Sequence, residues 1–73
     1  MKPFRVGTLV QNRLESQAIA LIDENEAHVG IVPPSGIGMV VGIDSVHPWY
    51  IMLLTADGCC GWTADVQFKN INE

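Results

Sequence analysis

The segment Trp49–Ala64 is the feature of the sequence that most restricts the fold. Trp49–Thr55 is rich in aromatic and apolar residues and is too short for a typical helix, so it indicates a β-strand. Asp57 and Gly58 follow, and Asp-Gly is the preferred centre of a two-residue type I′ hairpin turn, in which the glycine supplies a positive φ. Cys59–Ala64 then returns antiparallel to the first strand, so the segment predicts a β-hairpin.

A two-residue turn would also set the register of this hairpin, with Thr55 opposite Cys60. One face would then carry Ile51, Leu53, Cys60 and Trp62, and the other would carry Tyr50, Met52, Leu54, Cys59 and Gly61. Neither face contains the polar residues that a sheet places on a solvated side. The hairpin therefore predicts one face that fills a core and a second apolar face that needs a partner or another subunit.

Further strands are predicted on both sides of the hairpin, at Phe4–Val10, Gly36–Asp44 and Gln67–Ile71. The glycines of the second of these strands indicate bends or close approaches of the backbone. Asp65 is expected to cap a single 3₁₀ turn before the last strand.

Residues 11–36 form a long excursion between the first two strands, and the sequence permits two interpretations of it. A helical stripe is matched at four positions: Leu14, Ala18, Leu21 and Ile22. Alternatively, Ala18–Ile22 and Ala27–Val32 flank the polar run Asp23–Glu26 as the arms of a hairpin flank its loop. Pro33 and Pro34 then end any regular structure. The hairpin is the favoured interpretation.

Length and composition narrow the class of protein. The 73 residues fit a single small domain, 1–73, and a hydrophobic share of 48% against 16% charged excludes disorder. No apolar run approaches the ~20 residues of a membrane-spanning helix. The net charge is −4, and no Lys or Arg lies between Leu14 and Gln67. This charge distribution argues against binding to nucleic acid or to an anionic membrane.

The order of the five main strands, with a long first connection, resembles the SH3-like barrel. The matching segments, about two thirds of the chain, are Val6–Val10, Gly38–Ile43, Trp49–Asp57 and Gly58–Trp62. Their loose pattern is Val-Gly-x-Leu-Val, then a glycine-rich Val-Val strand, then an aromatic strand that leads into Asp-Gly and Gly-Trp. Within that fold, it resembles small SH3-like proteins of tailed bacteriophages, particularly marine and cyanobacterial phages.

The resemblance implies an all-β, five-stranded SH3-like barrel in which residues 11–36 take the place of the long first loop. It also implies a virion or assembly component that acts by contact rather than by catalysis. Such a protein would be located in the virion or in the cytoplasm of an infected bacterial host, and would be neither secreted nor held in a membrane.

Three aromatic residues permit two interpretations. Trp49, Tyr50 and Trp62 could form a groove for a proline-rich or extended peptide, and the acidic run Asp23–Glu26 could complete it. In the favoured interpretation, Trp62 fills the barrel and Trp49 caps its end, because large aromatic side chains dominate small cores. The acidic run would then be a solvated loop tip.

Other chemistry-bearing residues do not form a recognisable site. Cys59 and Cys60 are adjacent on a strand and would point to opposite faces, so they can neither bridge normally nor share a metal. His28 and His47 lack metal-ligand spacing and a partnered nucleophile. We therefore predict no catalytic residue, no metal site and no cofactor.

One remote enzymatic alternative rests on Val66–Lys69, which is similar in three positions to the Val-Gln-Ile-Tyr segment of type II dihydrofolate reductases. Those enzymes are oligomeric SH3-like barrels of similar length. Lys69 stands where that family has tyrosine, and the negative net charge suits an anionic cofactor poorly.

These observations together predict a non-enzymatic structural or interaction module that forms a homo-oligomer or joins a larger assembly of proteins. The residues expected to bind the partner are Trp49, Tyr50, Met52, Leu54, Ile19, Leu21, Val29 and Ile31. The alternative is a soluble adaptor that binds peptides in an aromatic groove around Tyr50.

Overall fold

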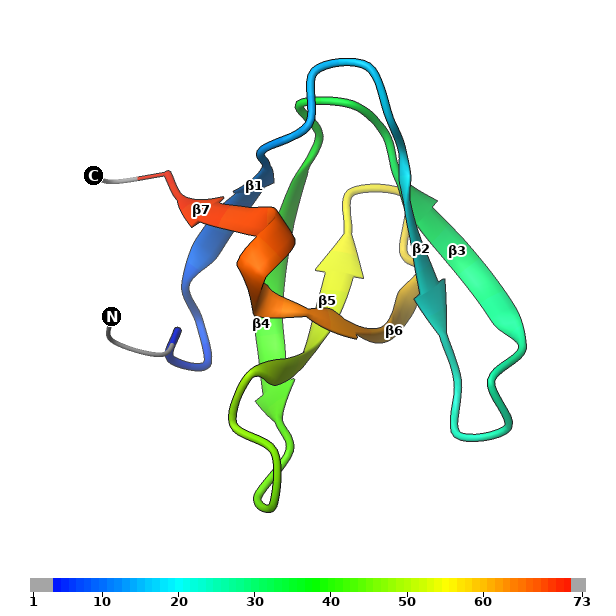
Figure 1. Ribbon diagram of the computed structural model, residues 1–73, viewed down its shortest axis with the longest axis vertical. Coiled ribbons are helices and arrows are strands. Elements are labelled where there is room, and N and C mark those ends of the chain that lie inside the picture. Colours follow the sequence, from blue (N-terminus) through cyan, green and yellow to red (C-terminus); the bar gives the residue numbers. More distant parts are fainter. Residues whose placement is uncertain (1–3, 72–73) are drawn as a thin grey trace.

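The structure, a computed structural model, describes residues 4–71, and these contain seven strands and one 3₁₀ turn (Figure 1). The elements are β1 Leu9–Asn12, β2 Ile19–Ile22, β3 His28–Val32, β4 Ile37–Ile43, β5 Tyr50–Thr55, β6 Cys60–Ala64, η1 Asp65–Gln67 and β7 Phe68–Asn70. The predicted all-β class is therefore confirmed.

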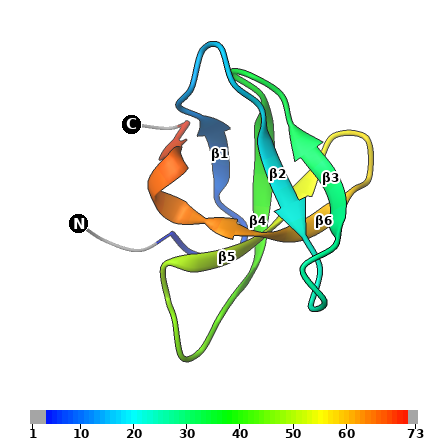
Figure 2. The ribbon, with the colours of Figure 1, turned by 45° about the vertical axis from the view of Figure 1, so that its right-hand side comes forward.

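The seven strands form one antiparallel sheet in the order β3-β2-β6-β5-β4-β1-β7. Its two end strands, β3 and β7, are not paired with each other, so the sheet is not closed. The sheet bends sharply, and the β2–β3 hairpin faces β1 across the molecule (Figure 2). The five main strands that were predicted are present as β1, β4, β5, β6 and β7, but the excursion adds two strands to the same open sheet, so a five-stranded barrel is not confirmed.

The excursion is a hairpin, as favoured from the sequence. Ile19 pairs with Val32 and Leu21 with Gly30, and the buried Ile19 and Leu21 alternate with the exposed Ala20. This alternation is the pattern of a strand with one face on the core. The carboxylate of Asp23 closes the hairpin loop by accepting hydrogen bonds from the backbone N–H groups of Asn25 (2.8 Å) and Ala27 (3.0 Å).

The core lies on the inner face of the bent sheet. Its buried side chains come from six strands: Val10, Ile19, Leu21, Val32, Val40, Ile51, Leu53 and Phe68. Phe4, Leu14 and Ile43 pack against its margin. Because the β2–β3 hairpin contributes three of these core residues, the excursion is part of the core rather than a surface appendage.

A buried asparagine fastens the excursion to the sheet. The side-chain nitrogen of Asn12 lies within hydrogen-bond distance of the carbonyl oxygens of Gln17 (2.9 Å), Val32 (3.3 Å) and Pro33 (3.1 Å). Its side-chain oxygen accepts the backbone N–H of Leu14 at 2.8 Å. Asn12 thus joins the two ends of the excursion with a side chain that is only 2% exposed.

The β5–β6 hairpin is present, but the predicted two-residue turn is wrong. The backbone N–H of Gly58 donates to the carbonyl of Thr55 (3.0 Å), and the N–H of Thr55 donates to the carbonyl of Cys59 (2.8 Å). The loop therefore has three residues, 56–58, and Gly58 takes the left-handed position with φ 90°.

The longer loop shifts the predicted register by one residue. Leu54 pairs with Cys60, Leu53 with Gly61 and Met52 with Trp62. A shift of one residue moves every side chain of a strand to the other face of the sheet. Gly61 therefore faces the core, whereas Trp62 and Cys60 join Tyr50, Met52 and Leu54 on the outer face.

The two ends of the described chain also differ from the predictions. Strand β1 begins at Leu9 rather than at Phe4, because the N–H of Thr8 donates to the carbonyl of Arg5 (3.0 Å) in a turn that includes Gly7 at φ 95°. Asp65 is the first residue of η1 rather than its cap, and the capping position is occupied by Ala64 without a side-chain hydrogen bond. The final strand is confirmed as the shorter β7.

Candidate functional site

Four aromatic rings form a continuous row that runs from the loop between β4 and β5 onto the outer face of β5 and β6. We name this row the aromatic ladder. It consists of His47, Trp49, Tyr50 and Trp62. The ring centroids of successive members lie 5.4, 5.6 and 5.5 Å apart. The first two contacts are edge-to-face, and the Tyr50 and Trp62 rings are stacked with an angle of 5° between their planes.

The contact between Tyr50 and Trp62 in the ladder depends on the register of the β5–β6 hairpin. Trp62 stands opposite Met52 on the outer face, where it reaches Tyr50, the diagonal neighbour of its strand partner. It does not belong to the core cluster, so the favoured prediction that Trp62 fills the barrel is wrong. Trp49 is 54% exposed and presents most of its ring to solvent.

Asp44 fixes the backbone of the loop between β4 and β5, which carries His47 and Trp49 of the ladder. One carboxylate oxygen of Asp44 accepts the backbone N–H groups of Val46 (2.8 Å) and His47 (3.0 Å). Hydrogen bonds from the backbone of His47 first, and then of Val46, lower the pKa of Asp44, and the imidazole Nδ1 of His47 lies 3.9 Å from the same oxygen. The loop is further closed by the N–H of Tyr50, which donates to the carbonyl of His47 at 2.8 Å.

The partner-binding residues predicted from the sequence fall into three places. Tyr50, Met52 and Leu54 share the outer face of the sheet and are half-buried, and Trp49 lies beside Tyr50 in the preceding loop. Ile31 and Val29 are exposed on β3. Ile19 and Leu21, at 5% and 0% exposed, belong to the core and leave no surface for a partner, so their assignment to a partner surface is wrong.

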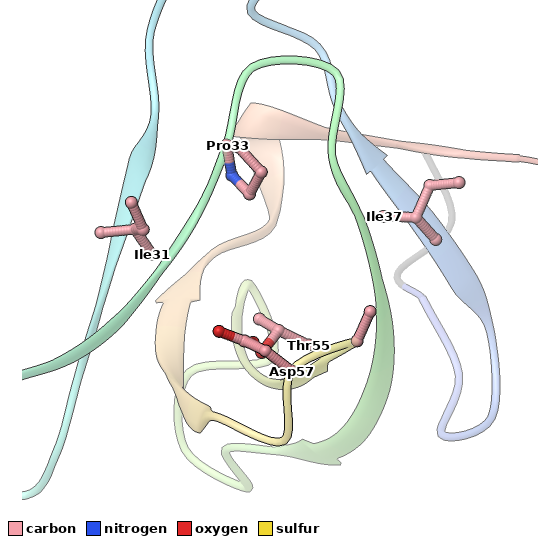
Figure 3. Close-up of a pocket in the computed structure, with 6 residues that line it drawn as sticks. Ile31, Pro33, Ile37, Thr55 and Asp57 are labelled. Carbon is pink, nitrogen blue, oxygen red and sulfur yellow. The ribbon is translucent and has the colours of Figure 1, made fainter.

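A second candidate site is a groove of about 390 Å³ at the opposite end of β5 from the ladder. It is lined by Ile31, Pro33, Ile37, Thr55, Ala56 and Asp57. Ile31 and Ile37 stand on opposite sides, with Pro33 above and Thr55 and Asp57 below (Figure 3). Only Ile31 among these residues was predicted from the sequence to bind a partner, because the groove forms only when the β2–β3 hairpin lies beside the β5–β6 turn.

The polar end of this groove is the β5–β6 turn. The hydroxyl of Thr55 donates to one carboxylate oxygen of Asp57, and the Cys59 thiol lies 3.8 Å from the other. The Thr55 hydrogen bond is the main cause that lowers the pKa of the Asp57 carboxyl. Asp57 therefore stays ionised at the edge of an otherwise apolar opening.

Replacing Thr55 by valine tests whether its hydroxyl lowers the pKa of Asp57. Without the hydroxyl, we expect the pKa of Asp57 to rise toward its ordinary value of 3.8, as followed by NMR titration of its side-chain carbons. Because the folded-state pKa is depressed, the stabilisation from this hydrogen bond is present above 3.8 and disappears as the pH falls through the folded-state pKa. The difference in the free energy of unfolding between the parent protein and Thr55→Val should therefore become smaller at acidic pH. An unchanged Asp57 titration in Thr55→Val would contradict the assignment.

The remaining chemistry-bearing residues do not assemble into a site. Cys60 is exposed and Cys59 half-buried, and both are free thiols. His28 is exposed on β3. Within residues 4–71 no group of three or more His, Cys, Asp or Glu side chains gathers as metal ligands would. Of the segment Val66–Lys69, Phe68 is a core residue and Val66 is exposed on η1.

Comparison with known proteins does not assign the chain to a family. No family model matches it, and neither the curated proteins nor the solved structures yield a match. Among the residues that the structure describes, no helix has the length and apolarity to cross a membrane.

Proposed function

We propose that this chain is a non-enzymatic interaction module that works in a larger assembly by binding other structural proteins or further copies of itself. The observation that carries this proposal is the apolar outer face of β5 and β6. Trp49, Tyr50, Met52, Leu54 and Trp62 lie on or beside one surface, and the described chain covers it only in part. Exposed apolar patches of this kind are typical of protein contacts.

We further propose that the fold is an SH3-like barrel and that the assembly is the virion of a tailed bacteriophage. The uninterrupted order β7-β1-β4-β5-β6 supports the fold, since these are the five main strands of the resemblance. The β2–β3 hairpin in the first connection and η1 before the last strand support it further. The virion role rests on the sequence resemblance alone.

The test is the solution mass of the purified chain, measured by light scattering over a concentration series. We expect a multimer, and we expect Trp49→Ser to raise its dissociation constant about tenfold, which corresponds to ~1.4 kcal/mol. Val66→Ser is the matched control, because Val66 is also exposed but lies on η1. A monomer of 8.0 kDa at every concentration would contradict the assembly role.

The ladder itself favours a second candidate, a peptide-binding adaptor with its groove around Tyr50. Rows of aromatic rings bind extended proline-rich segments, and Trp49 is exposed in the isolated chain. This candidate predicts a monomer whose tryptophan fluorescence changes saturably with a proline-rich peptide. A fluorescence signal that stays flat throughout the titration would dismiss it.

A further inference from the structure

The groove beside the β5–β6 turn has the features of a site for an aliphatic chain. Ile31 and Ile37 are 58% and 49% exposed, although each is a large apolar side chain. They face the same opening from β3 and β4, with Pro33 between them along the chain (Figure 3). The groove between these two side chains, its apolar walls, can therefore hold the methylene groups of a ligand, which need apolar contacts and no hydrogen bonds.

The Asp57 carboxylate adds a negative charge at one end of these walls. The Thr55 hydroxyl donates to one of its oxygens, and the Cys59 thiol lies 3.8 Å from the other. Within residues 4–71 no Lys, Arg or His lies within ion-pair distance of Asp57. The carboxylate thus carries a negative charge that no cation of the described chain neutralises.

The charge of the surroundings favours a cationic ligand over an anionic or a neutral one. The chain has no Lys or Arg between Leu14 and Gln67, so every residue that lines the groove belongs to a cation-free stretch. An anionic ligand would be repelled by the carboxylate, and a neutral apolar one would contact the walls but leave the charge without a partner. A cation on a flexible aliphatic chain can contact both the apolar side chains and the Asp57 carboxylate.

We propose that this groove receives a lysine side chain of a partner protein, with its methylenes between Ile31 and Ile37 and its ammonium group on the Asp57 carboxylate. This inference rests on the proposed role as a protein-binding module, but it concerns a surface at the other end of β5 from the ladder. A partner protein is the fitting source because an exposed ion pair contributes at most about 1 kcal/mol by itself. The remaining affinity would come from the lysine methylenes between the two walls and from the peptide residues on either side of the lysine.

The test is an NMR titration of the ¹⁵N-labelled full chain with the peptide Ac-Ala-Ala-Lys-Ala-Ala-NH₂. In parallel, the same peptide is used with norleucine in place of lysine. We expect saturable shifts of the amides of Ile31, Ile37 and Gly58 with the lysine peptide, and an affinity about fivefold lower with norleucine. Equal affinity of the two peptides would overturn the proposal, as would the absence of shifts. n-Butylammonium that binds as tightly as the lysine peptide would overturn the assignment to a partner protein.

Asp57→Asn and Glu24→Gln form a matched pair of variants. Both remove one negative charge, but Glu24 is exposed in the β2–β3 loop, whereas asparagine at position 57 keeps an oxygen for the Thr55 hydroxyl. We expect only Asp57→Asn to weaken the lysine peptide, about fivefold. Equal weakening in both variants would show a general charge effect and overturn the site.

Ile37→Thr provides a second variant in case Asp57→Asn alters the turn. It removes part of one wall, leaves the charge in place and keeps a β-branched residue in β4. It should also weaken the lysine peptide. Undiminished binding in Ile37→Thr, or shifts confined to the amides of the ladder, would overturn the groove as the lysine site. Neither result would affect the light-scattering test of the proposed function.

Discussion

Replacing Asn12 by aspartate is expected to lower the free energy of unfolding by about 3 kcal/mol at neutral pH. The substitution keeps the shape of the side chain but exchanges its only donor for an oxygen. That oxygen would face the carbonyl groups of Gln17, Val32 and Pro33 in a site that is 2% exposed. These acceptors, one buried and two partly buried, would then lose their partner, and a charge would be buried without a counter-ion.

The matched control is the neighbouring Gln11→Glu, which makes the same amide-to-carboxylate change. The side-chain nitrogen of Gln11 donates to the carbonyl of Ser35 at 2.9 Å, but this hydrogen bond is exposed. Its loss should cost less than about 0.5 kcal/mol in urea unfolding. Equal costs at positions 11 and 12 would show that Asn12 does not fasten the excursion.

The pH dependence of Asn12→Asp gives an independent check. Burial and the surrounding carbonyl oxygens should raise the pKa of the introduced carboxyl above its unfolded-state value. A group with a raised folded-state pKa binds its proton more tightly in the folded protein, so lowering the pH favours folding. The deficit of this variant relative to the parent protein should therefore shrink from neutral to mildly acidic pH. A deficit that is constant over this range would contradict the buried position of the carboxyl.

Most of the secondary structure could be predicted from the sequence, because its signals are local. The apolar alternation at Ile19–Ile22 and the polar loop after it identify the excursion as a hairpin. Asp57 and Gly58 mark the second hairpin correctly. The same dipeptide also fits the last two positions of a three-residue loop, in which the glycine again takes the left-handed conformation. The residues of the turn therefore identify the hairpin but do not decide its register.

The candidate sites could be predicted only in part, because that register determines them. The ladder requires Trp62 on the same face as Tyr50, which a loop one residue shorter would prevent. The groove is lined by Ile31 and Asp57 together, although they lie far apart in the sequence. Asn12 gives no signal in the sequence either, since a polar residue at the end of a strand is ordinarily exposed.

The second large effect is expected for Gly61→Ala, which should cost about 2–3 kcal/mol by overpacking. Gly61 faces the core under the β2–β3 hairpin. A Cβ atom there would lie 2.7 Å from the Cβ of Leu21, 2.8 Å from a methyl group of Val29 and 3.2 Å from the backbone nitrogen of Ile22. These atoms can move away only if the hairpin as a whole is lifted from β6.

Gly38→Ala is the matched control for this substitution. Gly38 is also buried in a central strand, but the nearest atom to a Cβ there is the carbonyl oxygen of Leu54 at 3.4 Å. Neither glycine has a positive φ, so steric contact is the difference between the two sites. We expect less than about 1 kcal/mol for Gly38→Ala in urea unfolding. Similar costs for both variants would mean that the hairpin does not pack closely on Gly61.

Gly61→Ala should also affect the two candidate sites unequally, because the hairpin supplies a wall of the groove but contacts the ladder only where Ile22 pairs with Trp62. Ile31 forms a wall of the groove and lies on β3, whereas the ladder is built from β5, β6 and the loop before β5. Lifting the hairpin should therefore weaken binding at the groove and leave the stacking of Tyr50 and Trp62 in place. We expect altered amide shifts at Ile31 and Asp57 in the folded variant and near-native shifts at Trp49. If the shifts at Trp49 change as much as those at Ile31, the two surfaces are not independent.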